Sequence, residues 1–196
     1  MNSISPVHFE TERLYMREFT MADADAVFEY AGNMDNTGFL PWSPEPYDEV
    51  VKFIERRLAS QIESPRTEYD FAVCLKENDV MIGAMGLYLK DERRQAELGY
   101  IFNMKYWHKG YALEAAKGYL RFGFLGLDLH RIYARCDDKN EASRRVMERV
   151  GMRQEAHFIK SEYTKVFGKS GWRSFYHYAI TEKEYLNSLP DGDYSV

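Results

Sequence analysis

Cysteine is scarce in this sequence, and its two cysteines, Cys74 and Cys136, are far apart and form no Cys-x-x-Cys pair. Structural zinc sites and disulfide frameworks both need several ligating residues at short, regular spacings. We therefore predict neither a metal site nor a disulfide scaffold. Both cysteines lie in apolar, strand-like runs, so we expect them to be buried thiols.

Long hydrophobic runs are absent as well. Residues 1–11 contain no apolar stretch of the length found in signal peptides, and no later stretch is long enough to span a bilayer. These absences predict a cytoplasmic protein without a membrane partner. Internal repeats and low-complexity tracts are also missing from the sequence.

The sequence has no excess of positive charge, since its formal net charge at pH 7 is -5. An acidic chain is not drawn to nucleic acid or to acidic membranes unless it carries a local basic patch. The Arg-Arg pairs at 56–57, 93–94 and 144–145 are isolated and have no aromatic residues interleaved with them. We therefore expect no nucleic-acid partner.

The sequence does contain enough apolar material for a folded domain. Of its 196 residues, 45% are hydrophobic and 15% are aromatic, which is not the composition of a disordered chain. This length suits one domain with a substantial core and is too short for two large ones. We predict a single domain over residues 1–196, with its core between about 10 and 185 and a mobile polar tail over 187–196.

The spacing of apolar residues predicts alternating strands and helices, with glycine, proline and acidic or amide clusters between them. The segment 33–47 contains Gly38 and three prolines, so we expect a loop there. Strands are expected at 14–18, 69–75, 80–88, 96–103, 130–136, 154–163 and 172–180, and helices at 20–32, 48–62, 111–124 and 141–150. This order predicts an α/β (mixed α+β) protein in which helices cover a mixed sheet.

Residues 96–116 hold the most informative pattern. Over residues 96–103 the side chains alternate between two faces, which indicates a strand. Beyond Gly110 apolar residues recur at intervals of three and four residues, which indicates a helix. The free N–H groups and the dipole of such a helix start attract anions, and Lys105, His108 and Lys109 are close by in sequence. The pattern predicts a site for a diphosphate-sized anion, although an ordinary strand–helix connection explains the same residues.

A second segment completes a recognisable pattern. About thirty residues after Trp107-His108-Lys109-Gly110-Tyr111-Ala112, the run Asn140-Glu141-Ala142-Ser143 begins a helix that ends at Arg149-Val150-Gly151-Met152. Together with the opening Glu10-Thr11-Glu12-Arg13-Leu14, these segments resemble the GCN5-related N-acetyltransferase (GNAT) superfamily over about residues 10–185. The resemblance is greatest to the branch of ribosomal-protein N-terminal (alanine/serine) acetyltransferases.

This resemblance implies a GNAT fold, in which about four helices flank a twisted, mostly antiparallel mixed sheet of about seven strands. The sheet is expected to splay between the strands at 96–103 and 130–136. The resemblance also implies acetyl-CoA (coenzyme A) as cofactor, with its acetyl group in the resulting gap. A monomer or a homodimer is expected, the dimer being a habit of the family.

The implied cofactor site combines a turn, a strand edge and a helix start. In the family, backbone N–H groups of the turn bind the CoA pyrophosphate, and a free strand edge pairs with the pantetheine amides. The family typically has Gln or Arg where this chain has Trp107, a difference that backbone donors tolerate. The matching residues are Trp107, His108, Lys109, Gly110, Tyr111 and Ala112 in the turn, Ile101, Phe102 and Asn103 on the edge, and Asn140, Ser143 and Arg144 at the helix start.

The implied reaction is direct acetyl transfer from the thioester to an amine. A covalent acyl-enzyme is not expected, because no histidine partner is readable beside Cys136. Glu97 matches the position of a general base that acts through water in some members; its alternative role is that of a structural carboxylate. Many members use a tyrosine from the second helix as the acid, but residues 145–148 contain none. In the ribosomal branch a serine at the position of Ser143 is a proposed alternative, so the resemblance makes Ser143 our candidate for the acid.

The acceptor is predicted from the basicity of amines. An α-amino group has a pKa of roughly 8 and a lysine side chain of roughly 10.4, so neutralising a lysine at pH 7 costs about 3 kcal/mol more. A site without an evident strong base suits the α-amine, which favours the N-terminus of a protein such as a ribosomal protein. Trp42 and Glu97 are our candidates for contact with this substrate.

Two alternatives stay open. The first is a small amine, such as an antibiotic, a polyamine or an amino acid, attracted by acidic residues such as Glu45 and Glu162. The second is a catalytically silent regulator that binds acyl-CoA. The aromatic-rich segments 39–47 and 157–172 are expected to form the acceptor wall.

Overall fold

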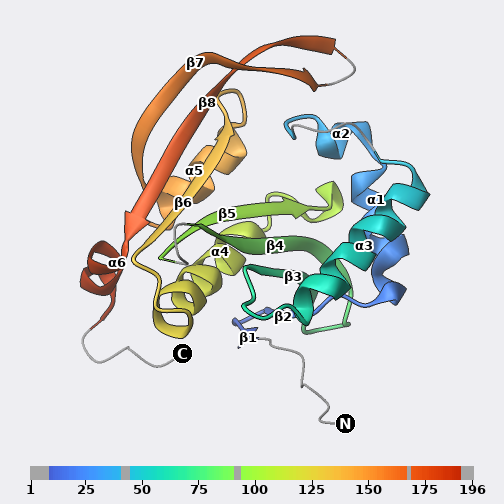
Figure 1. Cartoon of the computed structure of the whole chain (residues 1–196), viewed down its shortest axis with the longest axis horizontal. Helices are drawn as coiled ribbons and strands as arrows, with labels where there is room; N and C mark the ends of the chain where they lie inside the picture. Colours follow the sequence, from blue (N-terminus) through green and yellow to red (C-terminus); the bar gives the residue numbers. More distant parts are fainter. Residues whose placement is uncertain (1–8, 41–44, 91–93, 167–168, 191–196) are drawn as a thin grey trace.

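The computed structural model describes residues 9–40, 45–90, 94–166 and 169–190. Its strands form one eight-stranded sheet in the order β1-β2-β3-β4-β5-β6-β8-β7 (Figure 1). The strands are β1 (Phe9–Glu10), β2 (Leu14–Arg17), β3 (Glu68–Leu75), β4 (Met81–Lys90), β5 (Gln95–Phe102), β6 (Arg131–Asp137), β7 (Arg153–Val166) and β8 (Lys169–Thr181). The α-helices are α1 (Ala24–Ala31), α2 (Met34–Thr37), α3 (Tyr47–Gln61), α4 (Tyr111–Arg121), α5 (Glu141–Arg149) and α6 (Glu182–Ser188).

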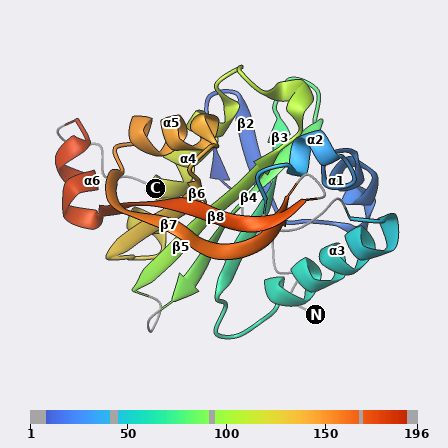
Figure 2. The same ribbon diagram turned by 90° about the horizontal axis from the view of Figure 1, so that it is seen from above.

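Helices cover both faces of this sheet, and each face has its own apolar core (Figure 2). On one face the core includes Ala116 and Tyr119 of α4 and Met147 of α5. On the other face it includes Val27 of α1 and Ile54 of α3. The small residues of α4 bring this helix close to the sheet, where the Tyr119 hydroxyl donates a hydrogen bond to the Met85 carbonyl. The predicted architecture of helices around a mixed sheet is confirmed.

The sheet opens between β5 and β6, as predicted. The two strands are parallel and pair only through Gln95↔Arg131, Ala96↔Ile132 and Glu97↔Tyr133. Beyond that point β5 stays paired with β4 as far as Phe102, and β6 stays paired with β8 as far as Asp137. Each strand is therefore held on its outer side while its inner side is left without a neighbouring strand.

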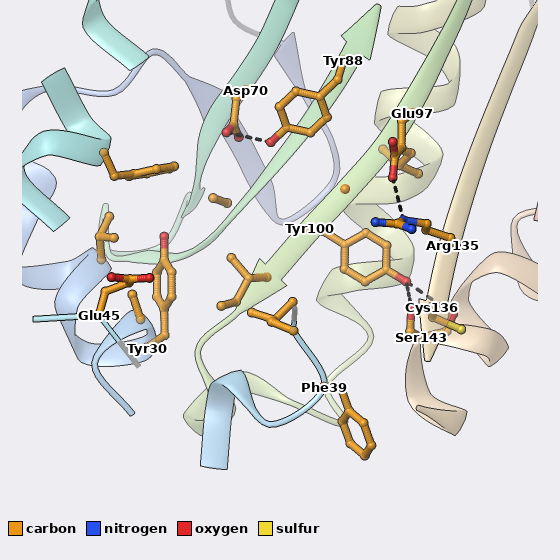
Figure 3. Close-up of a pocket in the computed structure, with 18 of the residues that line it drawn as sticks. Tyr30, Phe39, Glu45, Asp70, Tyr88, Glu97, Tyr100, Arg135, Cys136 and Ser143 are labelled. Atoms are coloured by element: carbon orange, nitrogen blue, oxygen red, sulfur yellow. Dashed lines mark hydrogen bonds and ion pairs between the residues drawn. The ribbon is translucent and has the colours of Figure 1, made fainter. Parts of the chain in front are cut away.

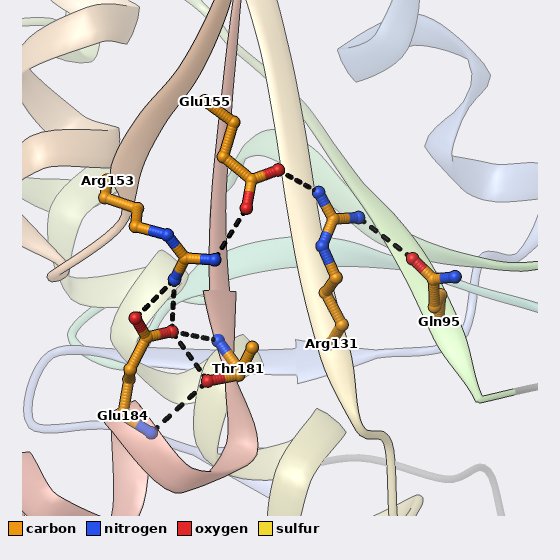
Figure 4. A network of polar contacts seen from close by, with 6 residues as sticks. All are labelled: Gln95, Arg131, Arg153, Glu155, Thr181 and Glu184. Carbon is orange, nitrogen blue, oxygen red and sulfur yellow. Dashed lines mark hydrogen bonds and ion pairs between the residues drawn. The ribbon is translucent and has the colours of Figure 1, made fainter.

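A polar network fixes the closed end of this opening (Figure 4). Arg131 of β6 donates to Gln95 of β5 at 2.9 Å and pairs with Glu155 of β7. Arg153 then links Glu155, at 2.6 Å, to Glu184 of α6. These contacts hold β5, β6, β7 and α6 together where β5 and β6 begin, so the point from which the two strands diverge is fixed.

Three elements differ from the sequence expectations. The two-residue strand β1 adds an eighth strand by pairing with β2, and the short helix α2 lies within the segment expected to be a loop. Helix α6 includes part of the segment expected to be a mobile tail, because Thr181 and Glu184 cap its start reciprocally. Residues 191–196 of that tail lie outside the described residues. Among the helices that are described, none combines the length and the apolar character needed to cross a membrane.

Candidate functional site

A cavity of about 610 Å³ lies where β5 and β6 diverge (Figure 3). Its lining comes from both faces of the sheet. Glu97 and Tyr100 of β5 and Ser143 of α5 line one part, and Tyr30 of α1 and Asp70 of β3 line another. The opening of the sheet therefore joins two spaces that a continuous sheet would separate.

The free edge of β5 faces this cavity. The N–H of Asn103 donates to the carbonyl of Ile82 on β4 at 2.8 Å. Because backbone groups alternate between the two sides of an antiparallel strand, those of Ile101 and Asn103 face β4, and those of Tyr100 and Phe102 face the gap. The Phe102 carbonyl already accepts bonds from Trp107 Nε1 at 2.8 Å and Asn36 Nδ2 at 3.0 Å.

The edge available for a ligand is therefore centred on Tyr100, which lies beyond the last β5–β6 pair. Sequence reasoning did not include this residue. Of the three edge residues that it did propose, Asn103 serves the fold: its side chain accepts from the Lys105 N–H at 3.1 Å and donates to Glu29 at 3.0 Å. A cofactor contact from Ile101, Phe102 or Asn103 stays a prediction.

The turn before α4 has the geometry of an anion site. His108 and Gly110 both adopt positive φ angles, of 62° and 82°, and Gly110 is the residue that begins the helix. Among the described residues, no group accepts a hydrogen bond from the N–H of His108, Lys109 or Gly110. Alternating left-handed residues followed by a helix start leave several N–H groups free to bind one anion.

This turn is braced from the segment between β1 and β2 by contacts that sequence reasoning missed. The Glu114 carboxylate accepts bonds from Thr11 Oγ1 at 2.6 Å and from Arg13 Nε at 2.6 Å, while Arg13 Nη1 donates to the Lys109 carbonyl at 3.1 Å. Burial alone would raise the pKa of Glu114, but the bonds from Thr11 and Arg13 outweigh it and lower the pKa. Arg13 thus offsets a negative charge that would otherwise repel an anion at the helix start.

The start of α5 presents a hydroxyl to the cavity. Asn140 caps the helix, its side chain accepting from the Ser143 N–H at 3.1 Å. The Ser143 Oγ lies 2.8 Å from the Tyr100 hydroxyl, which reaches across from β5 (Figure 3). Burial raises the pKa of Tyr100 above its ordinary value, so its neutral phenol serves as a hydrogen-bonding group. The pair can therefore supply a proton or a hydrogen bond to a group in the cavity.

Cys136 of β6 lies beside this pair (Figure 3). Burial raises the pKa of its thiol to about 12, so the thiolate that a nucleophile needs is scarce at neutral pH. Among the described residues, no group of three or more His, Cys, Asp or Glu side chains is arranged to hold a metal ion.

Glu97 is brought into the same cavity, with a cation beside it. Its carboxylate lies 3.5 Å from Nε of Arg135, and Arg135 also pairs with Glu162 of β7. About a third of the Glu97 side chain is exposed, so the group can be reached from the cavity. Neither Arg135 nor Glu162 was connected with Glu97 by sequence reasoning, because the three residues lie on separate strands.

The remaining predicted residues are placed as follows. Arg144 is half-buried and pairs with Glu148 at 3.3 Å and Glu141 at 3.4 Å on its own helix. Trp107 is anchored through its Nε1 and still 38% exposed. Trp42 lies outside the described residues. Tyr111 and Ala112 form the first turn of α4.

Comparison with known proteins gives a consistent result. A family model described as an acetyltransferase (GNAT) domain matches residues 13–153. The uncharacterized N-acetyltransferase YnaD of Bacillus subtilis (strain 168) is 34% identical over 179 residues, which are 91% of this chain and 99% of that protein.

Two solved structures show the shared fold at lower identity. A spermidine N-acetyltransferase from Vibrio cholerae, in complex with CoA and spermine, is 21% identical with a TM-score of 0.76, and the match covers 89% of this chain and 99% of that one. RimL, a ribosomal L7/L12 alpha-N-protein acetyltransferase in complex with coenzyme A, is 16% identical with a TM-score of 0.75, covering 87% and 95%.

Proposed function

The chain belongs to the GNAT family of acetyltransferases, and we propose that its acceptor is a small primary amine that enters the cavity on the side of α1 and α3. One observation carries this proposal. A single cavity joins the open edge of β5 to a chamber between the sheet and these two helices. An amine held in the chamber would meet the opening of the sheet, where Tyr100 and Ser143 lie.

The residues present fit acetyl-CoA, which supplies the acetyl group as a thioester. The free N–H groups of 108–110 suit its pyrophosphate, since backbone donors at a helix start bind such anions. The unpaired backbone of Tyr100 suits its pantetheine amides, because an open strand edge offers hydrogen bonds to an extended ligand. Asn140 and Ser143 line the cavity next to this edge.

The protonation steps are assigned to two groups. Glu97 takes up the proton that the acceptor amine must lose, and Arg135 pairs with the Glu97 carboxylate before this transfer. The hydroxyls of Ser143 and Tyr100 hold the proton that the leaving sulfur needs, and Tyr100 fixes the position of Ser143 Oγ. Glu97 and the Tyr100–Ser143 pair line the same cavity, so direct transfer of the acetyl group from the thioester to the amine needs no covalent acyl-enzyme.

The chamber suits a cationic amine with an apolar part. Glu45, Glu49 and Asp70 contribute carboxylates to its lining, and Val27 and Phe53 contribute apolar surface. A concave site lined by acidic groups concentrates cations, and the apolar surface provides van der Waals contact for a hydrocarbon chain. The solved spermidine N-acetyltransferase shows that a small amine is compatible with this fold.

The second candidate acceptor is a protein N-terminus, as the sequence predicted. The long β7–β8 hairpin extends beyond the end of β5 towards α2 (Figure 1). It carries the exposed rings of Tyr163 and Trp172, whose centroids are 5.6 Å apart. These two exposed rings are placed to contact the residues that follow the first residue of a bound peptide. The solved structure of RimL, an alpha-N-protein acetyltransferase, supports a protein acceptor on this fold.

Mass spectrometry of acetylated products decides between these acceptors. Acetyl-CoA is supplied with small primary amines, with peptides that have a free N-terminus, and with N-terminally blocked peptides that contain lysine. The proposal predicts product with the small amines, and a loss of turnover in Glu97→Gln but not in the remote, exposed control Glu77→Gln. Product only with free peptide N-termini would support the second candidate, and CoA binding without any turnover would support a silent regulator.

A further inference from the structure

The far end of the cavity contains a buried hydroxyl with no partner. Tyr30 of α1 is only 2% exposed, and its hydroxyl is buried without a hydrogen bond among the described residues. The ring lines the cavity and directs this hydroxyl into it (Figure 3). A buried hydroxyl without a partner is unfavourable, so a polar group is expected to meet it there when the site is in use.

A buried carboxylate lies near this hydroxyl. Asp70 of β3 is 5% exposed and lines the same cavity. Its Oδ2 accepts from the Tyr88 hydroxyl at 2.9 Å and lies 3.4 Å from Arg57 Nε. Among the described residues, Oδ1 has no hydrogen-bond donor. Burial raises the pKa of Tyr30 first, and the charge of Asp70 raises it further, so Tyr30 is neutral and within electrostatic reach of Asp70.

The charge of Asp70 is only partly neutralised within the protein. Arg57 is shared, because it also pairs with Glu68. The cluster of Arg57, Glu68 and Asp70 therefore has one more carboxylate than guanidinium. Glu45 and Glu49 add acidic groups to the same lining, and Arg56 adds one basic group. A hydrogen-bond donor that carries positive charge would therefore neutralise the excess negative charge of this cluster, which a neutral donor would not.

A glycine permits this arrangement. Tyr88 lies across the sheet face towards Asp70, and its ring passes beside Gly99 of β5. A Cβ at Gly99 would stand 3.2 Å from Tyr88 Cε2, so a larger residue would displace the ring. The hydrogen bond from Tyr88 leaves Oδ1 of Asp70 as the atom without a donor.

We propose that Tyr30 and Asp70 bind a second hydrogen-bond-donating group of the acceptor, an ammonium or a hydroxyl that an apolar stem connects to the acetylated amine. This inference rests on the proposed small-amine acceptor. The stem would lie against Val27, Val50 and Phe53, while the distal group donates to Asp70 Oδ1 and contacts the Tyr30 hydroxyl. The two residues thus select acceptors with two polar ends over simple monoamines.

Steady-state kinetics with three four-carbon amines tests this inference. The amines are butylamine, 4-aminobutanol and 1,4-diaminobutane, each assayed with the wild type, Tyr30→Phe and Asp70→Asn at a pH well above 6, where Asp70 is ionised. Tyr15→Phe and Asp79→Asn are matched controls, since this second Tyr–Asp pair, 3.3 Å apart, lies outside the cavity.

The wild type is expected to have a KM for at least one two-ended amine about ten-fold lower than its KM for butylamine. Tyr30→Phe should raise that KM about five-fold and Asp70→Asn about ten-fold, while the KM for butylamine and the controls change less than about two-fold. If the effect is confined to 1,4-diaminobutane, the distal group is an ammonium; if 4-aminobutanol responds equally, it is any donor.

Two results would overturn the inference, and they are distinguishable. If the wild type acetylates all three amines with equal KM, or if the variants lose activity equally toward all three, Tyr30 and Asp70 do not recognise a distal group. If no small amine is acetylated although coenzyme A binds, the small-amine acceptor is wrong and the inference fails with it. Tyr30→Phe removes only an unpartnered hydroxyl, so it is expected to fold even if Asp70→Asn does not.

Discussion

The hydroxyl of Tyr100 lies 2.8 Å from Oγ of Ser143, and this contact spans the opening in the sheet. Tyr100 belongs to β5 and Ser143 to the first turn of α5, so two elements that do not pair by backbone are joined by side chains. Tyr100 also lies 3.3 Å from the Ser143 carbonyl. The serine hydroxyl is thereby held at the open edge, where proton donation is needed.

Removing either hydroxyl should slow the chemical step. We expect Ser143→Ala to lower kcat about a hundred-fold, which is within the usual range for loss of a general acid. Tyr100→Phe should lower kcat about ten-fold, because the Ser143 hydroxyl remains but loses its hydrogen-bonding partner. The KM for acetyl-CoA should change little. Thiol release with a fixed acceptor measures both constants. Ser188→Ala, which removes a hydroxyl bonded to the Tyr185 carbonyl in α6, should leave kcat unchanged; wild-type rates in Ser143→Ala would rule out its assigned role.

The positive φ of Gly110 should be needed for cofactor binding. An alanine at φ 82° is strained by roughly 1–2 kcal/mol, so the turn of Gly110→Ala will shift and misdirect its N–H groups. We expect the KM for acetyl-CoA to rise about five- to thirty-fold with kcat nearly unchanged. Gly171→Ala is the matched control, because a Cβ there meets no atom within 4 Å. Equal KM values in the two variants would argue against an anion site at this turn.

Cys136 should be dispensable for transfer. Its buried thiol has a pKa of about 12, so Cys136→Ala is expected to keep kcat within about three-fold of the wild type. Intact-mass measurement after mixing the wild type with acetyl-CoA alone should show no acetylated protein. A stable acetyl adduct that disappears on adding an amine, and that Cys136→Ala lacks, would instead establish a covalent route.

The raised pKa of Asp70 should appear in the pH dependence of stability. Burial raises this pKa from 3.8 to about 6 although Arg57 opposes the change, so the folded state binds the proton more tightly than the unfolded state. Stability is therefore lost as pH rises between about 4 and 6, by about 3 kcal/mol in total for this group, and is regained as pH falls.

Denaturant unfolding of the wild type and Asp70→Asn measures this contribution. The free energy of unfolding of the wild type should fall relative to that of Asp70→Asn as pH rises through this window. Asp79→Asn, in an exposed turn, should follow the wild type at every pH. Parallel curves for the wild type and Asp70→Asn would show that Asp70 titrates normally.

Much of the fold and of the cofactor turn follows from local sequence patterns. The alternation in β5 places Leu98 and Phe102 in one core and Ile101 against the other, as predicted. Gly110 was predicted to begin a helix, and it does so in a left-handed conformation. Helix α6 could also have been found, because Thr181 and Glu184 have the spacing of a capping box.

The partners within the cavity could not be predicted in the same way. Tyr100 was missed because a tyrosine was sought on the second helix, whereas the structure brings one from a strand 43 residues away. Tyr30 and Asp70 line the same cavity only because α1 packs on the sheet, and neither has a distinctive sequence neighbourhood. Burial and opposing charges from distant segments decide their properties, and these depend on tertiary structure rather than on spacing.

Hydrogen–deuterium exchange with and without coenzyme A tests the central claim most directly. In the free protein, the N–H groups of His108, Lys109 and Gly110 have no acceptor among the described residues, and the Tyr100 backbone lies at an open strand edge. Saturating coenzyme A should therefore slow exchange in peptides that cover residues 99–102 and 108–113, and leave the remote β3–β4 turn unchanged. Unchanged exchange in both segments, with coenzyme A bound, would contradict the placement of the cofactor.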